Sequence, residues 1–356
     1  LGAVAFASFI PILLLSPFAG VLIDRVDRYK LVTFTQAASI VPAVILTVLT
    51  LSGLVTFWQV MVLATLQGII KAVEMPARQT FIVDLVGPKH LMNGIALHSI
   101  AFNSARVIGP TVAGLIIAAS GEGLAFAINT LSFMAVVFAL LMMDRPSPAP
   151  RPKEQARPLE DLKAGFRYVG RDSIIFSLVA MVAIQGFLIL PYLNLLPLFA
   201  GDILNAGPEG LGALLSAVGF GALLGGMTLA GLGNFRRKGI LALLATISFS
   251  LGLSVFALSG KLGLSLALLV VVGWSQIATL ALNNTLIQAQ VEDRFRGRVN
   301  SVRAWMLGGM LPIGSLLMGA LAESLGIARV IFVASLLGGL LIVGLFLREP
   351  RLRRLS

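Results

Sequence analysis

A dense cluster of acids and bases, Asp24-Arg25-Val26-Asp27-Arg28-Tyr29-Lys30, lies between two long apolar stretches near the start of the chain. Charges in such a position can form ion pairs that hold neighbouring helices in one of two arrangements. Asp24 can face the positive end of a helix in the other half of the chain, while Arg28 and Lys30 pair with acids across the cleft between the halves. The alternative is that Arg28 and Lys30 only orient their helix, which leaves the acid Asp24 without a role. We interpret the cluster as a candidate gate formed by Gly20, Asp24, Arg25, Arg28 and Lys30.

A second candidate site lies inside an apolar stretch. Arg106 is about fifteen residues from the start of this stretch at Met92, and an ionisable side chain at that depth needs a charged partner or water. Asn103 and His98 project within about 140° of the same helix face. We predict that this face lines a cavity for a small-molecule substrate. The alternatives are an internal ion pair for Arg106 and a packing role for His98.

Next to this face is a proline motif made of Gly109, Pro110 and Gly114. Proline has no N–H to donate to the carbonyl four residues earlier, which belongs to Arg106. We therefore expect the helix to bend there.

Glu74 is the one acid that we place at membrane depth, with Lys71 three residues before it and Arg78 four residues after it. Both cations can reach the carboxylate on a helix. A proton carrier needs a carboxyl group whose pKa is raised by burial, whereas a neighbouring cation lowers the pKa. We therefore predict that Glu74 is a structural partner of these cations.

Uncharged amides are the polar residues inside the later apolar stretches. Such groups suit a cavity for bulky, partly apolar molecules, and hydrogen bonds between helices explain them equally well. The candidate cavity residues are Gln185, Asn194, Gln276 and Asn283.

Motifs for enzyme chemistry are missing from the sequence. It contains no phosphate-binding loop, no zinc-binding histidine pair and no nucleophile elbow. With no cysteines and two histidines, thiolate sites and disulfides are excluded and a metal site is not expected. We expect neither an enzyme nor a cofactor, and an ATP-driven pump in one chain is excluded.

The composition is that of a membrane protein. Hydrophobic residues make up 57% of the 356 residues and charged residues 12%, against about 45–50% and about 25% in soluble proteins. The net charge of +11 is therefore interpreted loop by loop rather than as a sign of a nucleic-acid partner.

Eleven stretches approach the length of about 20 residues that crosses a bilayer. They are Leu1–Leu22, Leu31–Ser52, Phe57–Pro76, Met92–Ser120, Leu124–Met143, Ser173–Ala200, Leu211–Leu232, Ile240–Leu258, Leu262–Leu282, Val299–Ala322 and Ile327–Leu347. Nearly all loop cations then fall on one side, while only Lys261 and Arg329 fall on the other. By the positive-inside rule, the carboxyl terminus, the long central loop and the candidate gate are expected in the cytoplasm.

The chain divides into two related halves. A second basic loop at Arg236-Arg237-Lys238 lies about half a chain after the first, which suggests an internal repeat. We predict an N-terminal half at 1–143, a cytoplasmic linker at 144–172, a C-terminal half at 173–347 and a tail at 348–356. Because twelve spans would give two equal halves, eleven suggest a missing first helix; the alternative is a genuine eleven-span protein. An amphipathic piece, Pro158 to Tyr168, is expected on the membrane surface.

The stretch from Gly20 to Lys30 resembles the motif that joins the second and third helices of the major facilitator superfamily. Asp27 stands where that motif usually has Gly, and Tyr29 replaces a cation. Both changes resemble the prokaryotic branch that includes enterobactin and multidrug exporters. Further resemblances are Pro76-Ala77-Arg78-Gln79, Asn103 to Gly114 with its antiporter-type Gly-Pro pair, Arg296-Gly297-Arg298-Val299 and Pro312-Ile313-Gly314.

The resemblance implies an all-α protein of two pseudo-symmetric six-helix halves that exports a small amphipathic, drug-like or siderophore-like molecule by alternating access. It implies proton coupling and a monomer in the lipid bilayer. One departure concerns coupling: the family often has an Arg three residues before Gln67-Gly68, where this chain has Ala64. The alternatives are a lysophospholipid or metabolite carrier and a non-transporting sensor on the same fold.

Overall fold

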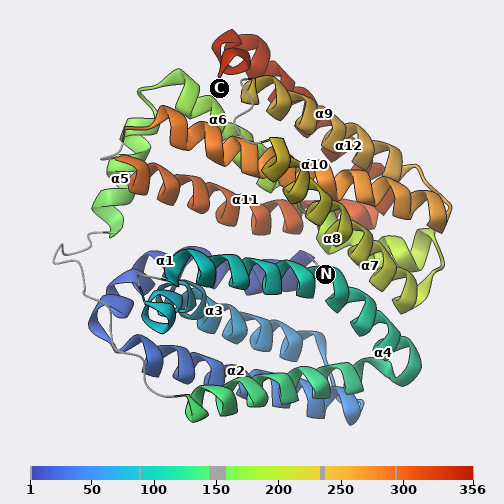
Figure 1. The fold of residues 1–356 in the computed structure, drawn as a ribbon. Coiled ribbons are helices and arrows are strands. Elements are labelled where there is room, and N and C mark those ends of the chain that lie inside the picture. The colour runs from blue at the N-terminus through green and yellow to red at the C-terminus, as the bar shows by residue number, and fades with distance from the viewer. Residues whose placement is uncertain (1, 88–89, 144–157, 233–236, 293–294, 356) are drawn as a thin grey trace. The chain divides into compact units, whose positions relative to one another are not determined.

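A computed structural model describes residues 2–87, 90–143, 158–232, 237–292 and 295–355. These residues are helical almost throughout and contain no strand (Figure 1), which confirms the predicted all-α fold. The helices of the first part are α1 (Gly2–Arg25), α2 (Arg28–Leu51), α3 (Phe57–Val86), α4 (Leu91–Met142) and α5 (Pro158–Val169).

The second part begins with one span built of four pieces. These are α6 (Ser173–Ile184), the π-helix η2 (Gln185–Ile189), α7 (Tyr192–Leu198) and the π-helix η3 (Phe199–Ile203). The later helices are α8 (Gly207–Leu232), α9 (Lys238–Ala257), α10 (Leu262–Gln290), α11 (Arg296–Leu325), α12 (Ile327–Arg348) and the short 3₁₀-helix η5 (Pro350–Arg354).

Nine helical segments of the described residues are long and apolar enough to cross a membrane, against the eleven that we predicted. The first predicted span qualifies only as a shorter apolar helix, Gly2–Leu15. The predicted spans at 92–120 and 124–143 both lie in α4, which supplies one qualifying segment, Ile108–Met142. Large apolar side chains are exposed on these helices, including Phe34, Trp58 and Phe138, as contact with lipid requires.

The long element α4 consists of two helices joined at Gly121. This glycine has φ 79° and ψ 173°, a conformation outside the helical region. Side chains with a Cβ rarely adopt positive φ, whereas glycine does so readily. Gly121 therefore ends the first helix and starts the second, close to the boundary predicted between 120 and 124.

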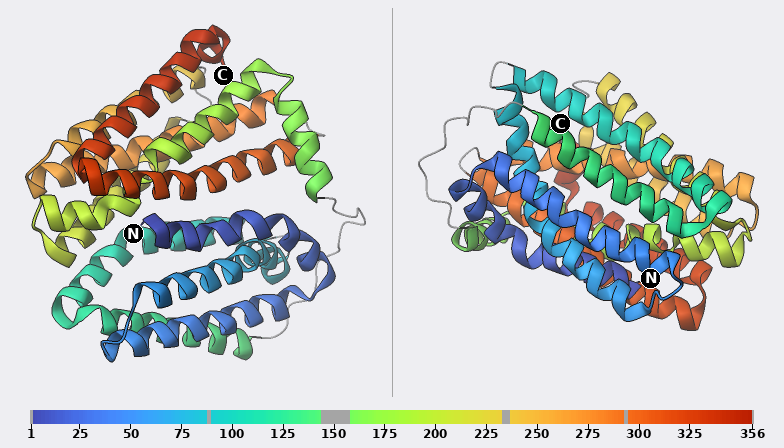
Figure 2. Two further views of the ribbon diagram at one scale, coloured as in Figure 1. Left: turned by 180° about the vertical axis from the view of Figure 1, so that it is seen from behind. Right: turned by 90° about the horizontal axis from the view of Figure 1, so that it is seen from below.

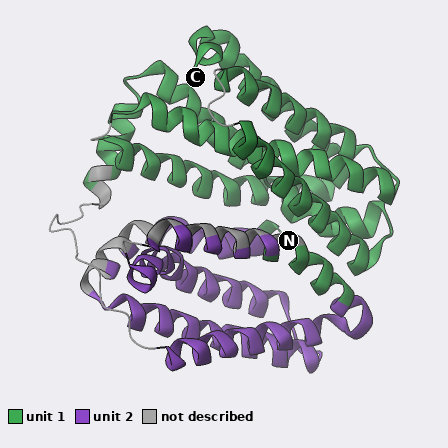
Figure 3. Cartoon of the chain, in the orientation of Figure 1, with its two compact units in different colours: residues 1–2, 105–115, 160–356 green, residues 3–104, 116–159 purple. Residues whose placement is uncertain are grey.

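The chain forms two compact units (Figure 3). Unit 1 comprises Leu1–Gly2, Ala105–Leu115 and Glu160–Ser356, and unit 2 comprises Ala3–Ser104 and Ile116–Leu159. Within each unit, long helices run side by side along nearly a common direction (Figure 2). The predicted division into halves at 143 and 173 stays a prediction.

In unit 1, helices α8 and α10 cross closely at glycines. A Cβ on Gly225 would come within 2.6 Å of the Trp274 carbonyl oxygen. Gly221 lies still closer to the backbone of Val270, and Gly273 to that of Val218. Small residues at such crossings let membrane helices approach backbone to backbone. The glycines therefore fix the separation of the two helices.

Unit 2 has a smaller core, formed where α1, α2, α3 and the second helix of α4 meet. Its buried residues are Ile23, Leu31, Val32, Ala77, Phe81 and Leu140. The hydroxyls of Thr47 and Thr130 lie 3.0 Å apart and connect α2 to α4 inside the unit. The Gln67-Gly68 pair noted in the sequence serves packing here, because Gly68 lies against the backbone of Ser8 in α1.

The amphipathic piece after the linker is a helix, α5, as predicted, but its apolar face packs on protein. Phe166 makes an edge-to-face contact with Trp305 of α11 at 5.7 Å between ring centroids. Tyr168 stacks on Phe295 at 4.4 Å, and Gly165 lies against the backbone of Arg298. The expectation that this face lies on the membrane surface is therefore wrong: burial against α11 removes the same apolar area from water.

Glu349, which follows α12, forms a hydrogen bond with the start of α6. Its carboxylate accepts hydrogen bonds from Arg351 Nε at 2.7 Å and from Ser173 Oγ at 2.7 Å. These bonds, from Arg351 first and Ser173 second, lower the pKa of Glu349 to about 2 from an ordinary value of 4.5.

A carboxyl group with a depressed pKa stabilises the folded protein above its unfolded pKa and loses that contribution as the pH falls to its folded pKa. We therefore expect Glu349→Gln to unfold at a slightly lower temperature than the wild type at pH 6, with the difference vanishing between about pH 4.5 and about pH 2. Thermal unfolding in detergent across this range measures it. A difference that does not change with pH would contradict the assignment.

Candidate functional site

The predicted gate region lies in unit 2, where α1 ends and α2 begins. Asp27 is the N-cap of this helix, and its carboxylate accepts a hydrogen bond from the backbone N–H of Lys30 at 3.2 Å. Capping satisfies a backbone donor that has no partner within the helix. This explains an acid at a position where the resembling motif usually has Gly.

Arg28 forms an ion pair inside unit 2. Its Nη1 lies 2.8 Å from Asp84 Oδ1 of α3, with both side chains nearly buried. We had expected Arg28 and Lys30 to pair with acids of the other half; the partner of Arg28 is instead an acid of its own unit, and Lys30 is exposed. Tyr29 donates a hydrogen bond to the Leu140 carbonyl of α4 at 2.9 Å. The start of α2 is thus tied to two other helices.

The remaining gate residues are in α1. Gly20, Asp24 and Arg25 lie near the end of this helix, and their side chains fall outside the described part of the structure. The gating role of Asp24 therefore stays a prediction.

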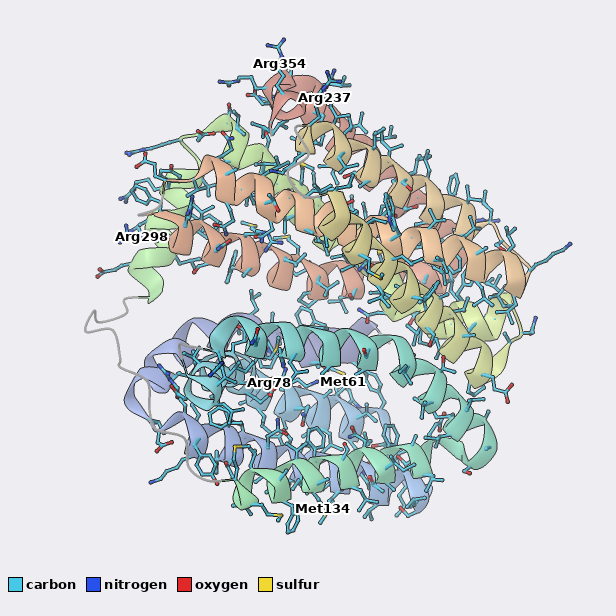
Figure 4. The ribbon with its side chains drawn as sticks, viewed as in Figure 1. Met61, Arg78, Met134, Arg237, Arg298 and Arg354 are labelled. Carbon is cyan, nitrogen blue, oxygen red and sulfur yellow. The ribbon has the colours of Figure 1, made fainter. Side chains whose placement is uncertain are left out.

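Glu74 lies buried in α3, as its predicted structural role requires. Its Oε1 is 3.3 Å from Arg78 Nε one turn later, and Gln36 of α2 donates to the same oxygen at 3.3 Å. Arg78 is labelled in Figure 4. Lys71, the other predicted neighbour, is exposed. The carboxylate therefore links α2 to α3.

We expect Glu74→Gln to lower stability by roughly 1–3 kcal/mol, because the buried carboxylate loses its charge-assisted bond to Arg78. The yield of folded protein should fall, whereas the response of transport to the pH gradient should be largely retained. Thermal unfolding and pH-gradient-driven transport of the full-length variant test this. A well-folded variant that moves substrate downhill but no longer responds to the pH gradient would identify Glu74 as the coupling acid.

The face predicted around Arg106 lies in α4. Arg106 and Asn103 have their backbone in this helix, but their side chains are outside the described part, while His98 is half-buried. The cavity predicted on this face stays a prediction.

Pro110 lies inside α4, and the non-helical residue of this element is Gly121 rather than a neighbour of Pro110. Gly114 packs against Gly212 of α8, where a Cβ on Gly212 would come within 2.7 Å of the Pro110 carbonyl oxygen. Thr111 also shares a hydrogen bond with Ser216 of α8. All these residues belong to unit 1. In this structure the motif serves close helix packing, and the bend expected at Pro110 stays a prediction.

Three of the four predicted amides bond to neighbouring helices of unit 1. Gln276 Oε1 accepts from Tyr192 Oη at 3.2 Å, and Asn194 Nδ2 donates to Ser315 Oγ at 2.8 Å. Asn283 Nδ2 donates to the Leu178 carbonyl at 2.9 Å. Of the two interpretations left open by the sequence, hydrogen bonding between helices describes these contacts.

Gln185 differs from the other three amides. It is fully buried at the start of η2, and neither its Nε2 nor its Oε1 has a hydrogen-bond partner. A buried amide without a partner is unfavourable by about 1–3 kcal/mol. π-helical turns such as η2 occur frequently at functional sites.

Arg303 lies inside α11, within the span predicted at Val299–Ala322, although the sequence predicted no site role for it. Its Nη2 donates to the Leu280 carbonyl of α10 at 3.4 Å, and its buried Nε has no partner. Its distance from the Arg296-Gly297-Arg298 motif was the available signal, since seven residues advance a helix by about 10 Å.

Other cations of unit 1 gather at one end. Arg237 and Arg354 lie at the same end of this unit (Figure 4). The Leu355 carbonyl accepts from the Gly239 N–H of α9 at 3.1 Å, which brings the chain end to the start of that helix. That these cations lie on the cytoplasmic side stays a prediction.

Comparison with known proteins finds similar sequences among curated bacterial transporters. The chain is 30% identical over 333 residues to the staphyloferrin A transporter of Staphylococcus aureus, covering 92% of this chain and 82% of that protein. It is 27% identical over 334 residues to the enterobactin exporter EntS of Shigella boydii, covering 92% of this chain and 77% of the relative.

Solved structures show the same fold at lower identity. A point mutant of the nucleoside transporter NupG matches with a TM-score of 0.75 at 13% identity, covering 97% of this chain and 90% of the other. A bacterial homologue of the human lysosomal transporter Spinster, inward-facing and occupied, matches with a TM-score of 0.72 at 16% identity, covering 100% and 90%. At such identities the likeness concerns the fold alone.

The model of the transmembrane secretion effector family matches residues 2–356, nearly the whole chain. The apolar helices, the charged turn before α2 and the two similar transporters agree with this match. The protein is a multi-pass membrane transporter and belongs to the transmembrane secretion effector family of the major facilitator superfamily.

Proposed function

We propose that this protein exports a siderophore across the cytoplasmic membrane of a prokaryote. The observation that carries the proposal is the similarity to the staphyloferrin A transporter and the enterobactin exporter EntS over 92% of the chain. Both names concern siderophores, so the substrate class follows from two relatives rather than one.

In this proposal the protein works by alternating access as a monomer, driven by the proton gradient, with its carboxyl terminus in the cytoplasm. The cations at one end of unit 1 support that orientation. Glu74 is engaged by Arg78 and Gln36, so we place the coupling acid elsewhere. Asp24 retains the proposed gating role, and Arg106 with Asn103 and His98 the proposed contact with substrate.

The direct test is transport by the full-length protein in proteoliposomes. Staphyloferrin A and enterobactin are the probes, with uptake into inverted vesicles measured with and without a pH gradient. We expect saturable uptake of at least one siderophore, accelerated by an acidic vesicle interior. Transport of neither probe by a folded protein would contradict the proposal.

Asp24→Asn separates gating from folding. The amide keeps the shape of the carboxylate but removes its charge, so an acid that pairs in one state of a two-state gate should no longer favour that state. We expect normal expression, slower export and altered labelling of single cysteines from the cytoplasmic side. Unchanged labelling together with normal transport would show that Asp24 does not gate.

A further inference from the structure

Four described side chains of unit 1 have buried polar atoms without partners, and three of these side chains lie in candidate membrane spans, the fourth being Arg353 of η5. Gln185 of η2 lacks partners at both amide atoms, Asn283 of α10 lacks one at Oδ1, and Arg303 of α11 lacks one at Nε. Gln185 and Asn283 are both 0% exposed. Buried polar groups are normally hydrogen-bonded, and the exceptions need an explanation such as an absent water or ligand.

Two hydrogen bonds with α10, one made by α6 and one by α7, lie on either side of Gln185 along its span. Asn283 bonds to Leu178, and Gln276 bonds to Tyr192. Gln185 lies seven residues after Leu178, on the same stripe of the helix. Gln185 therefore lies along its span between these two contacts with α10.

Arg303 contacts α10 from the helix α11. Its Nη2 donates to the Leu280 carbonyl at 3.4 Å, which among the described residues is its only hydrogen bond. Gly186, next to Gln185, lies against the backbone of Leu307, one turn after Arg303. Gln185 and Arg303 therefore each lie within about one turn of the contact between Gly186 and Leu307, where η2 meets α11.

Arg303 brings a positive charge to this region. No ion pair of Arg303 occurs within the described residues, and a cation within a membrane-spanning segment needs compensation. A planar guanidinium beside amide groups suits an anionic oxygen group, which it can bind through two parallel hydrogen bonds.

We propose that Arg303 and Gln185, assisted by Asn283, bind an anionic oxygen group of the transported molecule. This inference rests on the proposed siderophore function and deepens it. Molecules that chelate the hard ferric ion carry anionic oxygen donors, which is the chemistry that Arg303 and Gln185 leave unsatisfied.

The site is closed in this structure, because both amides are buried. Binding requires α11 to move away from η2. The two backbones are in close contact at Gly186 and Gly314. Gly314 lies against the backbone of Phe187 and Gly186 against that of Leu307. Such glycine contacts present flat surfaces between helices, and a π turn supplies backbone that can rearrange.

Three variants of the full-length protein test the site: Gln185→Met, Arg303→Met and the control Gln276→Met. Gln276 is a buried amide of the same type on the same interface, but its Oε1 already accepts from Tyr192. Binding of staphyloferrin A and enterobactin to purified protein gives the Kd, and thermal unfolding without siderophore gives the Tm.

Gln185→Met should keep or raise the Tm of the siderophore-free protein, because it removes a buried amide that bonds to nothing. The same change should weaken siderophore binding about tenfold or more, as should Arg303→Met. Arg303→Lys should restore part of the affinity, since it keeps the charge without the planar fork. Gln276→Met should lower the Tm and leave the Kd unchanged.

Two different failures can be told apart. If the wild type binds and exports a siderophore while Gln185→Met and Arg303→Met bind it equally well, the site is wrong and the proposed function stands. If Gln185→Met lowers the Tm as Gln276→Met does, the amide serves the protein or an ordered water only, and the site is again wrong. If the wild type binds neither siderophore, both proposals fail.

Discussion

Gly225→Ala is expected to destabilise the protein by about 1–3 kcal/mol, the range for inserting a methyl group into a tightly packed contact. The new Cβ would lie within 2.6 Å of the Trp274 carbonyl oxygen and 3.2 Å of its Cα. Backbone atoms cannot rotate away as side-chain atoms can, so α8 and α10 must separate. Thermal unfolding in detergent and titration with a denaturing detergent measure the loss.

The next residue in the sequence is the matched control. Gly226 has no atom within 4 Å of the position that a Cβ would occupy. Gly226→Ala should therefore leave stability unchanged or raise it by up to about 1 kcal/mol, because alanine favours the helix more than glycine. Equal effects of the two substitutions would show that the separation of α8 and α10 is not set at Gly225.

Arg28→Met and Asp84→Leu are each expected to cost about 3–5 kcal/mol, because each leaves a nearly buried charge without its partner. The two side chains are 12% and 6% exposed and join α2 to α3 at 2.8 Å. Surface ion pairs contribute far less, typically about 0–1 kcal/mol. Loss of folded protein, measured by size-exclusion chromatography and thermal unfolding, should accompany each single change.

The double variant Arg28→Met/Asp84→Leu distinguishes a structural pair from a gate. Removing both charges leaves neither side chain of the pair without the other, so the double variant should be more stable than the sum of the single changes predicts. A gate would behave differently: the single variants would fold normally, and the accessibility of the cytoplasmic side would change. That result would return Arg28 to the role first predicted from the sequence.

The helices themselves were predictable from apolar stretches, but their ends were not. The span predicted at Phe57–Pro76 continues to Val86 in α3, through Pro76 and two charged side chains. Arg78 and Asp84 are accommodated by Glu74 and Arg28, so the helix continues where hydropathy alone ends it. Similarly, α10 extends to Gln290, beyond the predicted end at Leu282.

Contacts between distant segments could not be predicted, because a helical pattern shows which face is apolar and not what covers it. The apolar face of α5 met Trp305 and Phe295 of the protein instead of lipid. The acid at Glu74 was predictable since its partner Arg78 is one turn away. The contact of Arg303 was not predictable, because its hydrogen-bond partner Leu280 comes from another helix.

The two π turns of the span from Ser173 to Ile203 also affect how this chain is to be aligned with its relatives. Each turn is closed by a backbone hydrogen bond between residues five apart. The Leu190 N–H donates to the Gln185 carbonyl at 2.8 Å, and the Leu204 N–H donates to the Phe199 carbonyl at 3.1 Å. Such a turn contains one residue more than an α-helical turn, whose hydrogen bonds join residues four apart. A relative with an unbroken α-helix here would differ by a one-residue gap, and losing one residue in either turn would rotate the following segment by about 100°. Single-residue insertions and deletions in this span would thus change which side chains face α10, without removing a membrane crossing.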